Sequence, residues 1–291
     1  MRWDGDRQSD NVEDRRGDSS GGGGGFGIGG GTLGIGSVAI ALLGSWFFGV
    51  SPGTILNLLS GGGGTQQVQQ APAHPPATDR ETQFVRTVLG YTEDTWTQIF
   101  KSNGATYSPP RLVLFSRRTP TACGTGQSAT GPFYCPADRK VYIDLSFFQL
   151  MQQRFKVGGE FTQAYVIAHE VGHHVQNLLG ISGKVDSARR NLSETQANAM
   201  SVRLELQADC FAGVWAYHTN QAKQIIEQGD IQSALAAASA IGDDALQRQS
   251  QGEVVPDSFT HGTSEQRVRW FTRGIQTGSV EQCNTFEARQ L

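Results

Sequence analysis

The stretch "FTQAYVIAHEVGHHVQNLLG", residues 161–180, determines how the rest of the chain is interpreted. It predicts a helix over residues 161–179, because Gly180 has the position and residue type that commonly end a helix. His169 and His173 are four residues apart, so they lie on one face of this helix about one turn from each other. The central question is what these two imidazoles and their neighbours hold.

The two histidines have the spacing of a zinc site. Two neutral imidazoles one turn apart can bind one Zn²⁺ at about 2.0–2.1 Å each. Glu170 lies about 100° further round the helix and borders the metal, where it can take a proton from zinc-bound water and return it to a leaving amine. His174 points away from the pair, and we expect a structural role for it: a hydrogen bond to Glu170 or to a backbone carbonyl, or exposure to solvent. Gly172 lets another backbone approach the helix closely.

A third zinc ligand is expected from the distant stretch "LELQADC", residues 204–210. Glu205 and Asp209 share one face of a long helix, and the apolar residues around them predict that this helix is largely buried. We expect Glu205 to bind zinc and Asp209 to accept a hydrogen bond from the far nitrogen of a ligating histidine, which fixes the tautomer of that ring. His261 is the alternative third ligand, whereas His218 lies about 220° from Glu205 and points elsewhere.

The remaining elements predict an α+β fold that is mostly helical, with a small antiparallel sheet. Two short strands are expected in "RLVLFS" and "KVYIDLSFF". The other expected helices are Glu81–Leu89; Glu93–Phe100, with Thr92 as its N-cap and Gly104 as its stop; one from the Ser193–Gln196 capping box to about Thr219; short helices within Ile225–Gln249; and one from the Thr263–Gln266 capping box to about Ile275. Residues 252–262 are expected to be a loop.

The N-terminal part of the chain differs in composition from the rest. Its charged start predicts a disordered tail over residues 1–25. Residues 26–50 are uncharged and long enough to cross a hydrocarbon core of about 30 Å, so residues 26–59 are predicted to be a transmembrane anchor region. A cleaved signal peptide and a buried helix are the alternatives. Residues 60–80 are expected to be a flexible linker, and residues 81–291 the main domain.

Charge predicts the orientation of this anchor. Arg2, Arg7, Arg15 and Arg16 precede it, and the next Lys or Arg is Arg80. The positive-inside rule therefore places the N-terminus in the cytoplasm and the main domain outside, with a single crossing between them.

The four cysteines all follow the apolar segment. Cys123 and Cys135 flank a loop rich in glycine and proline and can form a disulfide in an oxidising compartment. A second zinc site is the alternative, but no C-x-x-C pair is present. Cys210 and Cys283 are the remaining pair. The net charge of −3 and the scattered basic residues argue against binding to nucleic acid.

These motifs together resemble the neutral zinc metallopeptidase family of bacterial membrane-anchored proteins. The resemblance runs along nearly the whole chain, through "MRWDG", the Gly-rich segment, "GPFYCP", "VYIDLSFF", "AHEVGHHVQ", "ELQADCFAG" and "THGTSEQRVRWF". It implies a zincin-like peptidase domain, a Zn²⁺ cofactor, a protein or peptide substrate, and a single-pass location in the bacterial inner membrane with the domain in the periplasm or otherwise outside the cytoplasm.

The order H-E-x-x-H then E-x-x-x-D is also similar to the gluzincin class, which includes membrane-linked prenyl-protein proteases and heat-shock protease relatives. Their late Thr-His-Pro…Arg signature is matched here by Thr260, His261 and Arg267, with Gly262 in place of proline. The resemblance implies that His261 reaches the cleft and stabilises the oxyanion or organises the site; a structural role for this loop histidine is the alternative.

The leading hypothesis is therefore a zinc-dependent endopeptidase that hydrolyses peptide bonds with a zinc-activated water. Its substrate is expected to add as a strand along "KVYIDL", residues 140–145. The alternative is a membrane-tethered binding or assembly factor whose structural zinc is closed by His261 as a fourth ligand. An amidase of lipid or cell wall would use the same ligands, and the sequence specifies neither the cleavage specificity nor the oligomeric state.

Overall fold

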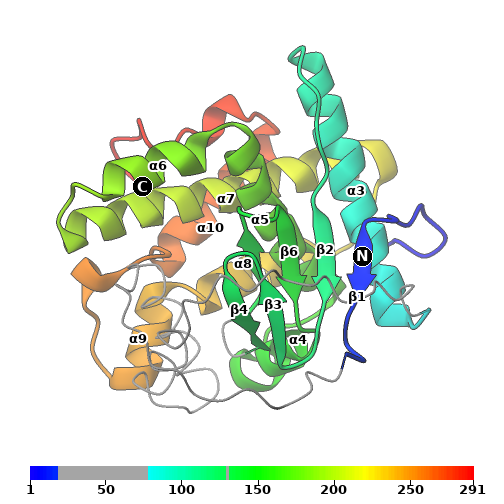
Figure 1. Cartoon of the computed structure of the whole chain (residues 1–291), viewed down its shortest axis with the longest axis horizontal. Helices are drawn as coiled ribbons and strands as arrows, with labels where there is room; N and C mark the ends of the chain where they lie inside the picture. The colour runs from blue at the N-terminus through cyan, green and yellow to red at the C-terminus, as the bar shows by residue number, and fades with distance from the viewer. Residues whose placement is uncertain (19–77, 129–130) are drawn as a thin grey trace. The chain divides into compact units, whose positions relative to one another are not determined.

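The computed structural model describes residues 1–18, 78–128 and 131–291 (Figure 1). The chain divides into two compact units. We call the unit formed by Met1–Asn11, Thr78–Pro110 and Phe148–Leu291 the helical unit, and the one formed by the described residues among Val12–Ala77 and Arg111–Phe147 the sheet unit. The predicted anchor, residues 26–59, lies outside the described residues, as does most of the predicted linker. Among the helices that are described, none has both the length and the apolar character needed to cross a membrane.

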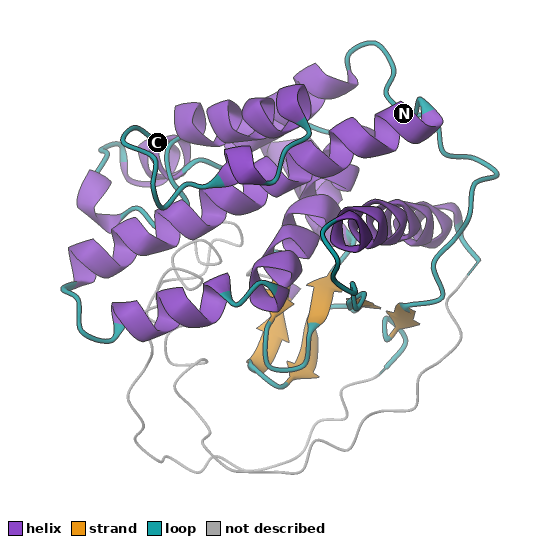
Figure 2. Cartoon of the chain, turned by 90° about the horizontal axis from the view of Figure 1, so that it is seen from above, coloured by secondary structure: helices purple, strands orange, loops and turns teal. Residues whose placement is uncertain are grey.

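The helical unit is built mainly of α-helices, coloured purple in Figure 2. They are α3 (Arg80–Ser102), α5 (Glu160–Leu178), α6 (Ile181–Arg189), α7 (Glu194–Lys223), α8 (Asp230–Ala240), α9 (Asp243–Gln251) and α10 (Ser264–Thr277). A short α4 (Ser146–Leu150) continues into a π-helical turn, Met151–Phe155, and two 3-10 turns follow at Pro256–Ser258 and Glu281–Cys283. The predominance of helices agrees with the predicted α+β class.

Capping and glycine spacing explain how the central helices form and pack. Both predicted capping boxes are present, Ser193 with Gln196 at the start of α7 and Thr263 with Gln266 at the start of α10. α5 and α7 approach closely at Gly172, where a Cβ would lie 3.1 Å from the carbonyl oxygen of Ala208 and 3.2 Å from its Cα. The predicted close backbone approach at Gly172 is therefore confirmed.

α7 crosses α10 through a second pair of small residues. A Cβ on Gly274 of α10 would collide with the carbonyl oxygen of Cys210, and one on Gly213 of α7 would collide with the carbonyl oxygen of Phe271. Helix backbones can meet at such short range only where both faces lack side chains. α7 is thereby fixed against α10 as well as against α5.

α3 is one continuous helix, not the two short helices that were predicted. Thr92 is not an N-cap, because its hydroxyl donates to the carbonyl oxygen of Leu89 within the helix. Gly90, within this helix, serves a contact: a Cβ at this position would lie 3.0 Å from the carbonyl oxygen of Arg7. The predicted stop at Gly104 is confirmed by its left-handed φ of 72°, just beyond the end of the helix.

The prediction of a disordered tail is wrong for residues 1–18. They include a strand, β1 (Val12–Asp14), and several buried side chains, among them Trp3 and Ser9. Several of the charges that suggested disorder are paired with charges of the folded chain, as between Arg7 and Glu93. Residues 19–25 of the predicted tail lie outside the described residues.

The sheet unit has four strands in the order β1-β2-β6-β5, with β2 at Arg111–Leu114, β5 at Phe133–Cys135 and β6 at Lys140–Ile143. β1 and β6 both pair with β2 in parallel, and only β5 pairs with β6 in antiparallel fashion. β3 (Arg118–Thr121) and β4 (Gly124–Gln127) form a separate antiparallel hairpin. The prediction of an antiparallel sheet is thus wrong for most of the sheet, because the two predicted strands β2 and β6 pair in parallel and the unpredicted β1 adds to β2 in parallel.

The predicted strand candidates β2 and β6 are present, but the role given to β6 is wrong. β6 lies between β2 and β5 and has no free edge, so a peptide cannot add to it as a further strand. Both cysteine pairings, Cys123–Cys135 and Cys210–Cys283, occur as disulfides. The core of the sheet unit includes Cys135 together with Tyr142, whose ring is stacked on that of Phe133.

Candidate metal centre

The two helices that meet at Gly172 bring the predicted ligands together. α5 carries His169 and His173, and α7 carries Glu205. The Oε2 atom of Glu205 lies 3.2 Å from Nε2 of His169 and 3.5 Å from Nε2 of His173. Within residues 1–18, 78–128 and 131–291 these three side chains form the one group of His, Cys, Asp and Glu that could hold a metal ion.

The spacing of this group fits zinc. Ligand atoms that lie 2.0–2.1 Å from a tetrahedral zinc are about 3.3 Å apart, which is close to the two separations measured from Glu205. Two imidazoles and one carboxylate are also a donor set of catalytic zinc sites, where the fourth position stays open for water or substrate. The arrangement of His169, His173 and Glu205 therefore matches the prediction.

Asp209 holds His169 from the side opposite the metal group. It is fully buried, and its Oδ1 lies 2.8 Å from Nδ1 of His169, which directs the other ring nitrogen toward Glu205. Tyr165 donates its hydroxyl to the same oxygen at 2.6 Å, and Arg267 donates from Nε to Oδ2 and from Nη2 to Oδ1, both at 2.9 Å. The predicted role of Asp209 as the partner of a ligating histidine is thus what the geometry shows.

This network sets the charges at the site before a metal enters. Burial alone would raise the pKa of Asp209, but Arg267 and His169 together lower it to about 2. Burial alone would lower the pKa of His169, but Asp209, with help from Glu205, raises it to about 10. In the metal-free protein at neutral pH, His169 therefore carries a proton that a metal ion must displace.

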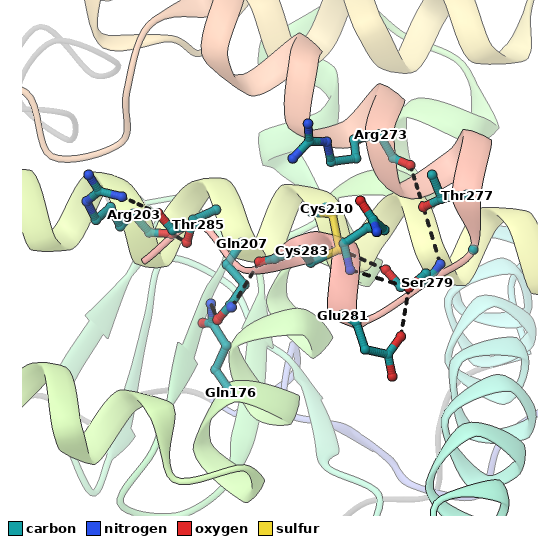
Figure 3. The surroundings of a disulfide bond; sticks show 12 residues. Gln176, Arg203, Gln207, Cys210, Arg273, Thr277, Ser279, Glu281, Cys283 and Thr285 are labelled. Carbon is teal, nitrogen blue, oxygen red and sulfur yellow. Dashed lines mark hydrogen bonds between the residues drawn. A yellow bond between two sulfur atoms is a disulfide. The ribbon is translucent and has the colours of Figure 1, made fainter. Parts of the chain in front are cut away.

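His173 is oriented by a relay of amides that sequence reasoning missed. Its Nδ1 lies 2.9 Å from Oε1 of Gln176, one turn further along α5. The amide nitrogen of Gln176 donates to the carbonyl oxygen of Leu204 at 2.7 Å and to Oε1 of Gln207 at 3.1 Å. Gln207 in turn donates to the carbonyl oxygen of Cys283 at 3.0 Å, as Figure 3 shows. Both ligating histidines thus have a fixed partner at the ring nitrogen away from the metal.

The disulfide between Cys210 and Cys283 anchors the far end of this relay (Figure 3). Cys210 directly follows Asp209, the partner of His169, on α7. The disulfide therefore joins the C-terminal segment to α7 one residue from that partner. Cys283 supplies the carbonyl oxygen that ends the chain of bonds from His173. The C-terminal segment is therefore tied to the supports of both histidines.

Glu170 is a buried carboxyl group beside the ligands. Only 7% of it is exposed. Burial raises its pKa, the charges of His169 and His173 oppose this rise, and Glu205 adds to it, so that the pKa lies above its ordinary value. A carboxyl group whose pKa is raised toward neutral pH can both accept and return a proton.

His261 is held by a residue that the sequence did not indicate. Asp243, the first residue of α9, accepts the backbone N–H groups of three successive residues, Thr260 at 2.7 Å, His261 at 2.6 Å and Gly262 at 3.1 Å. Its other oxygen lies 3.2 Å from Nδ1 of His261. Burial lowers the pKa of His261, but Asp243 and then Glu205 raise it above its ordinary value.

His261 does not belong to the ligand group of His169, His173 and Glu205. Its side chain is 21% exposed, and with Nδ1 facing Asp243 its Nε2 has no hydrogen-bond partner among the described residues. Glu205 is thus favoured over His261 as the third ligand.

The other histidines serve the fold. Nε2 of His174 lies 2.7 Å from the carbonyl oxygen of Ser108, and its ring meets Tyr107 edge-on. Because His174 is fully buried, its expected structural role is confirmed through the backbone-carbonyl alternative. His218 lies 2.8 Å from the carbonyl oxygen of Gly278, away from the ligands, as predicted.

A comparison with protein families agrees with this geometry. The family described as "Putative neutral zinc metallopeptidase" matches residues 1–286. The chain belongs to this zinc metallopeptidase family. Zn²⁺ is accordingly its cofactor, and His169, His173 and Glu205 are the residues that fit it.

Relatives in the zinc metallopeptidase family include proteins of distant bacteria. The chain is 52% identical to the uncharacterized protein YpfJ of Escherichia coli strain K12, over 98% of this chain and 99% of YpfJ. It is 46% identical to the uncharacterized protein Rv2575 of Mycobacterium tuberculosis strain H37Rv, over 64% of this chain and 65% of that protein. No solved structure matches the chain.

Sequence reasoning did not identify Gln176 and Asp243 of this metallopeptidase, for different reasons. Gln176 is three residues from His173, so the helical spacing that identified the ligands also contained its signal. Asp243 had no such signal, because it is 18 residues from His261 and approaches it only through the loop before α10. Tyr165 is an intermediate case. It is four residues before His169, so helical spacing places it near a ligand, but its bonding partner Asp209 lies on another helix.

Proposed function

We propose that the protein hydrolyses peptide bonds in protein or peptide substrates. The observation that carries this proposal is the place of Glu170, a buried carboxyl group next to three ligands for which the described residues offer no fourth side-chain ligand. A purely structural zinc site would be closed by such a ligand and would have no need of a proton acceptor at its border.

The residues of the site have different roles in the proposed reaction. When bound, zinc supplies a Lewis acid that acidifies water and polarises the scissile carbonyl group. Glu170 takes a proton from the attacking water and delivers it to the departing amine nitrogen. Asp209 and Gln176 keep the ligating imidazoles in one orientation, so that the ligands need not rearrange during turnover.

His261 is the proposed donor to the oxyanion. Asp243 faces Nδ1 and leaves Nε2 to donate, and the charge of Asp243 favours a protonated ring. A donor that is already oriented toward the developing negative charge stabilises the transition state without reorganisation. This role replaces the alternative of His261 as a zinc ligand.

The proposed location of the domain is outside the cytoplasm, attached to the inner membrane through the apolar segment at residues 26–50. Two disulfides support an oxidising compartment, because such bonds are rare in the bacterial cytosol. The uncharged, apolar composition of residues 26–50 supports attachment of the protein to the membrane.

The decisive experiment measures cleavage and metal content together. Purified protein is incubated with a fluorogenic peptide library, with zinc or with a chelator. The wild type is expected to cleave only with zinc, and Glu170→Gln is expected to keep one zinc per chain while losing at least about 100-fold in turnover, the usual size of a general-base effect.

Glu253→Gln, at an exposed loop position, is the matched control and should behave as the wild type. Unchanged turnover in Glu170→Gln would remove Glu170 from the mechanism. Stoichiometric zinc in a wild type that cleaves no peptide in the library would favour the alternative function, a binding or assembly factor with a structural metal.

A further inference from the structure

The first eleven residues of the chain pack along α3, which begins 69 positions after they end. Trp3 is buried, with its ring edge-on to Phe84 at 5.3 Å and the guanidinium group of Arg80 at 4.6 Å from its centroid. A buried aromatic ring in these contacts contributes apolar burial as well as a cation–π interaction. This end of the segment is therefore part of the core of the helical unit.

A buried carboxylate holds the middle of the segment. Glu93 of α3 is 7% exposed and accepts three hydrogen bonds, all from the first eleven residues: Arg7 at 2.9 Å, Ser9 at 2.6 Å and Asn11 at 2.7 Å. Arg7 also donates to Asp94 at 2.8 Å. Without the segment Glu93 would lose all three of these partners, and an unpaired buried charge is strongly destabilising.

The backbone of the first eleven residues also makes close contacts with α3. The N–H group of Ser9 donates to the carbonyl oxygen of Arg86, and Nε of Arg86 donates back to the carbonyl oxygen of Ser9, both at 2.9 Å. Gly90 leaves room for the carbonyl oxygen of Arg7 where any other residue would bring a Cβ to 3.0 Å. The first eleven residues are thus an element of the fold, and α3 is shaped to receive them.

The next residues continue this integration within the sheet unit. β1 pairs in parallel with β2, from Val12 opposite Leu112 to Asp14 opposite Leu114. The buried Glu13 is bound by Lys140 of β6 at 2.9 Å. Both units therefore contain residues from before and after the apolar segment.

We propose that residues 1–14 and residues 78–291 lie on the same side of any membrane that the protein contacts. A single crossing between them would place the bilayer between Arg7 and Glu93 and between β1 and β2, and would break every contact described above. The single-pass orientation with a cytoplasmic N-terminus, expected from the charges before the apolar segment, is incompatible with this packing. The proposal goes beyond peptide hydrolysis and does not depend on it.

The test is cysteine labelling in cells that express the full chain. Asp10 is almost fully exposed and Gln98 is exposed on α3, so Asp10→Cys and Gln98→Cys are the two reporters, while the four native cysteines are held in disulfides. Spheroplasts are treated with a membrane-impermeant maleimide before and after permeabilisation. Both reporters are expected to react in the same sample. Labelling of one reporter before permeabilisation and of the other only afterwards would overturn the proposal.

A second measurement tests the docking on which the proposal rests. In the detergent-solubilised full chain, Arg7→Glu should lower Tm by roughly 5 °C or more, because it replaces the partner of Glu93 by a like charge. Arg2→Glu is the control, since the exposed side chain of Arg2 makes a 3.8 Å contact with a half-exposed Glu227, and its backbone hydrogen bond does not depend on the side chain. Equal Tm values for Arg7→Glu and the wild type would show that the segment is not docked, and would overturn the proposal as well.

Discussion

At the scale of single residues, the site contains three histidines that are each fixed by a side-chain partner. His169 has Asp209, His173 has Gln176, and His261 has Asp243. Each partner is in turn held by other groups, so that few of these side chains can rotate alone. The consequence is a site whose shape exists before the metal binds, and whose ligands can be tested one at a time.

The assignment of the third ligand is testable by metal analysis. Glu205→Ala should reduce zinc affinity by more than the roughly 10–100-fold that is typical when only a supporting group is lost. His261→Ala should keep its zinc through dialysis, because His261 is outside the ligand group. Full retention of zinc by Glu205→Ala, with loss in His261→Ala, would reverse the two roles.

The proton on His169 predicts how zinc binding depends on pH. The metal-free protein has a raised pKa of about 10 at His169, so the ring is charged at pH 7, whereas zinc binds only the neutral ring. Affinity should therefore rise with pH, by about tenfold per unit for each proton released, as long as the pH is below that pKa.

Competition with a chelator of known affinity from pH 6.5 to 8.5 measures this slope, and calorimetry in two buffers counts the protons that are released. A zinc affinity that does not change over this range would contradict a protonated His169 in the metal-free state.

At the scale of elements, the meeting of α5 and α7 decides the distance between the histidines and Glu205. Gly172→Ala should push the two backbones apart by a few tenths of an ångström and cost about 1–3 kcal/mol of stability, as overpacking does. Zinc affinity should fall in the same variant, because Glu205 moves with α7.

Gly183→Ala, on the neighbouring α6, is the matched control. A Cβ there meets nothing within 4 Å, so this change should stabilise the protein by about 0.5–1 kcal/mol through the better helix propensity of alanine. Thermal unfolding and zinc titration of both variants separate the effect of contact from that of propensity. Equal zinc affinity in the two would show that the crossing does not set the ligand distance.

Sequence reasoning succeeded for elements whose signals are local. The capping boxes of α7 and α10 and the spacing of His169 and His173 depend on residues within one or two turns of each other. It failed for β1, whose three residues have no strand pattern of their own and become a strand by pairing with β2. It also failed to predict that α3 is continuous through Gly90, where the glycine admits the carbonyl oxygen of Arg7.

The same distinction holds for the site. Three ligands, the proposed base and Asp209 all lie on two helices at helical spacing, and all were predicted. Asp243 and Gln207 could not be, because each reaches its partner across a chain separation that only the folded structure closes.

At the scale of the whole molecule, the disulfide Cys210–Cys283 closes a sequence separation of 73 residues, against 12 for Cys123–Cys135. Chain entropy predicts that its removal costs about 4 kcal/mol, compared with about 3 kcal/mol for the shorter loop. Cys210→Ala combined with Cys283→Ala should also weaken zinc binding, because the carbonyl oxygen of Cys283 ends the relay from His173.

Cys123→Ala combined with Cys135→Ala is the control, and its zinc affinity should equal that of the wild type, since none of the bonds that hold the ligands involves this pair. Chemical denaturation and zinc titration distinguish the two disulfides. Identical losses of zinc affinity in the two double variants would show that the relay does not reach the metal.

The docking of the first eleven residues on α3 also orders the events of biosynthesis. These residues leave the ribosome before α3 does, yet Arg7 has its partners on α3, and the N–H group of Arg2 donates to the carbonyl oxygen of Ile225. Arg7 must therefore stay unpaired until α3 has been translated, and Arg2 until Ile225 has been translated. Folding of the helical unit is completed only when the beginning of the chain returns to helices that are translated long after it.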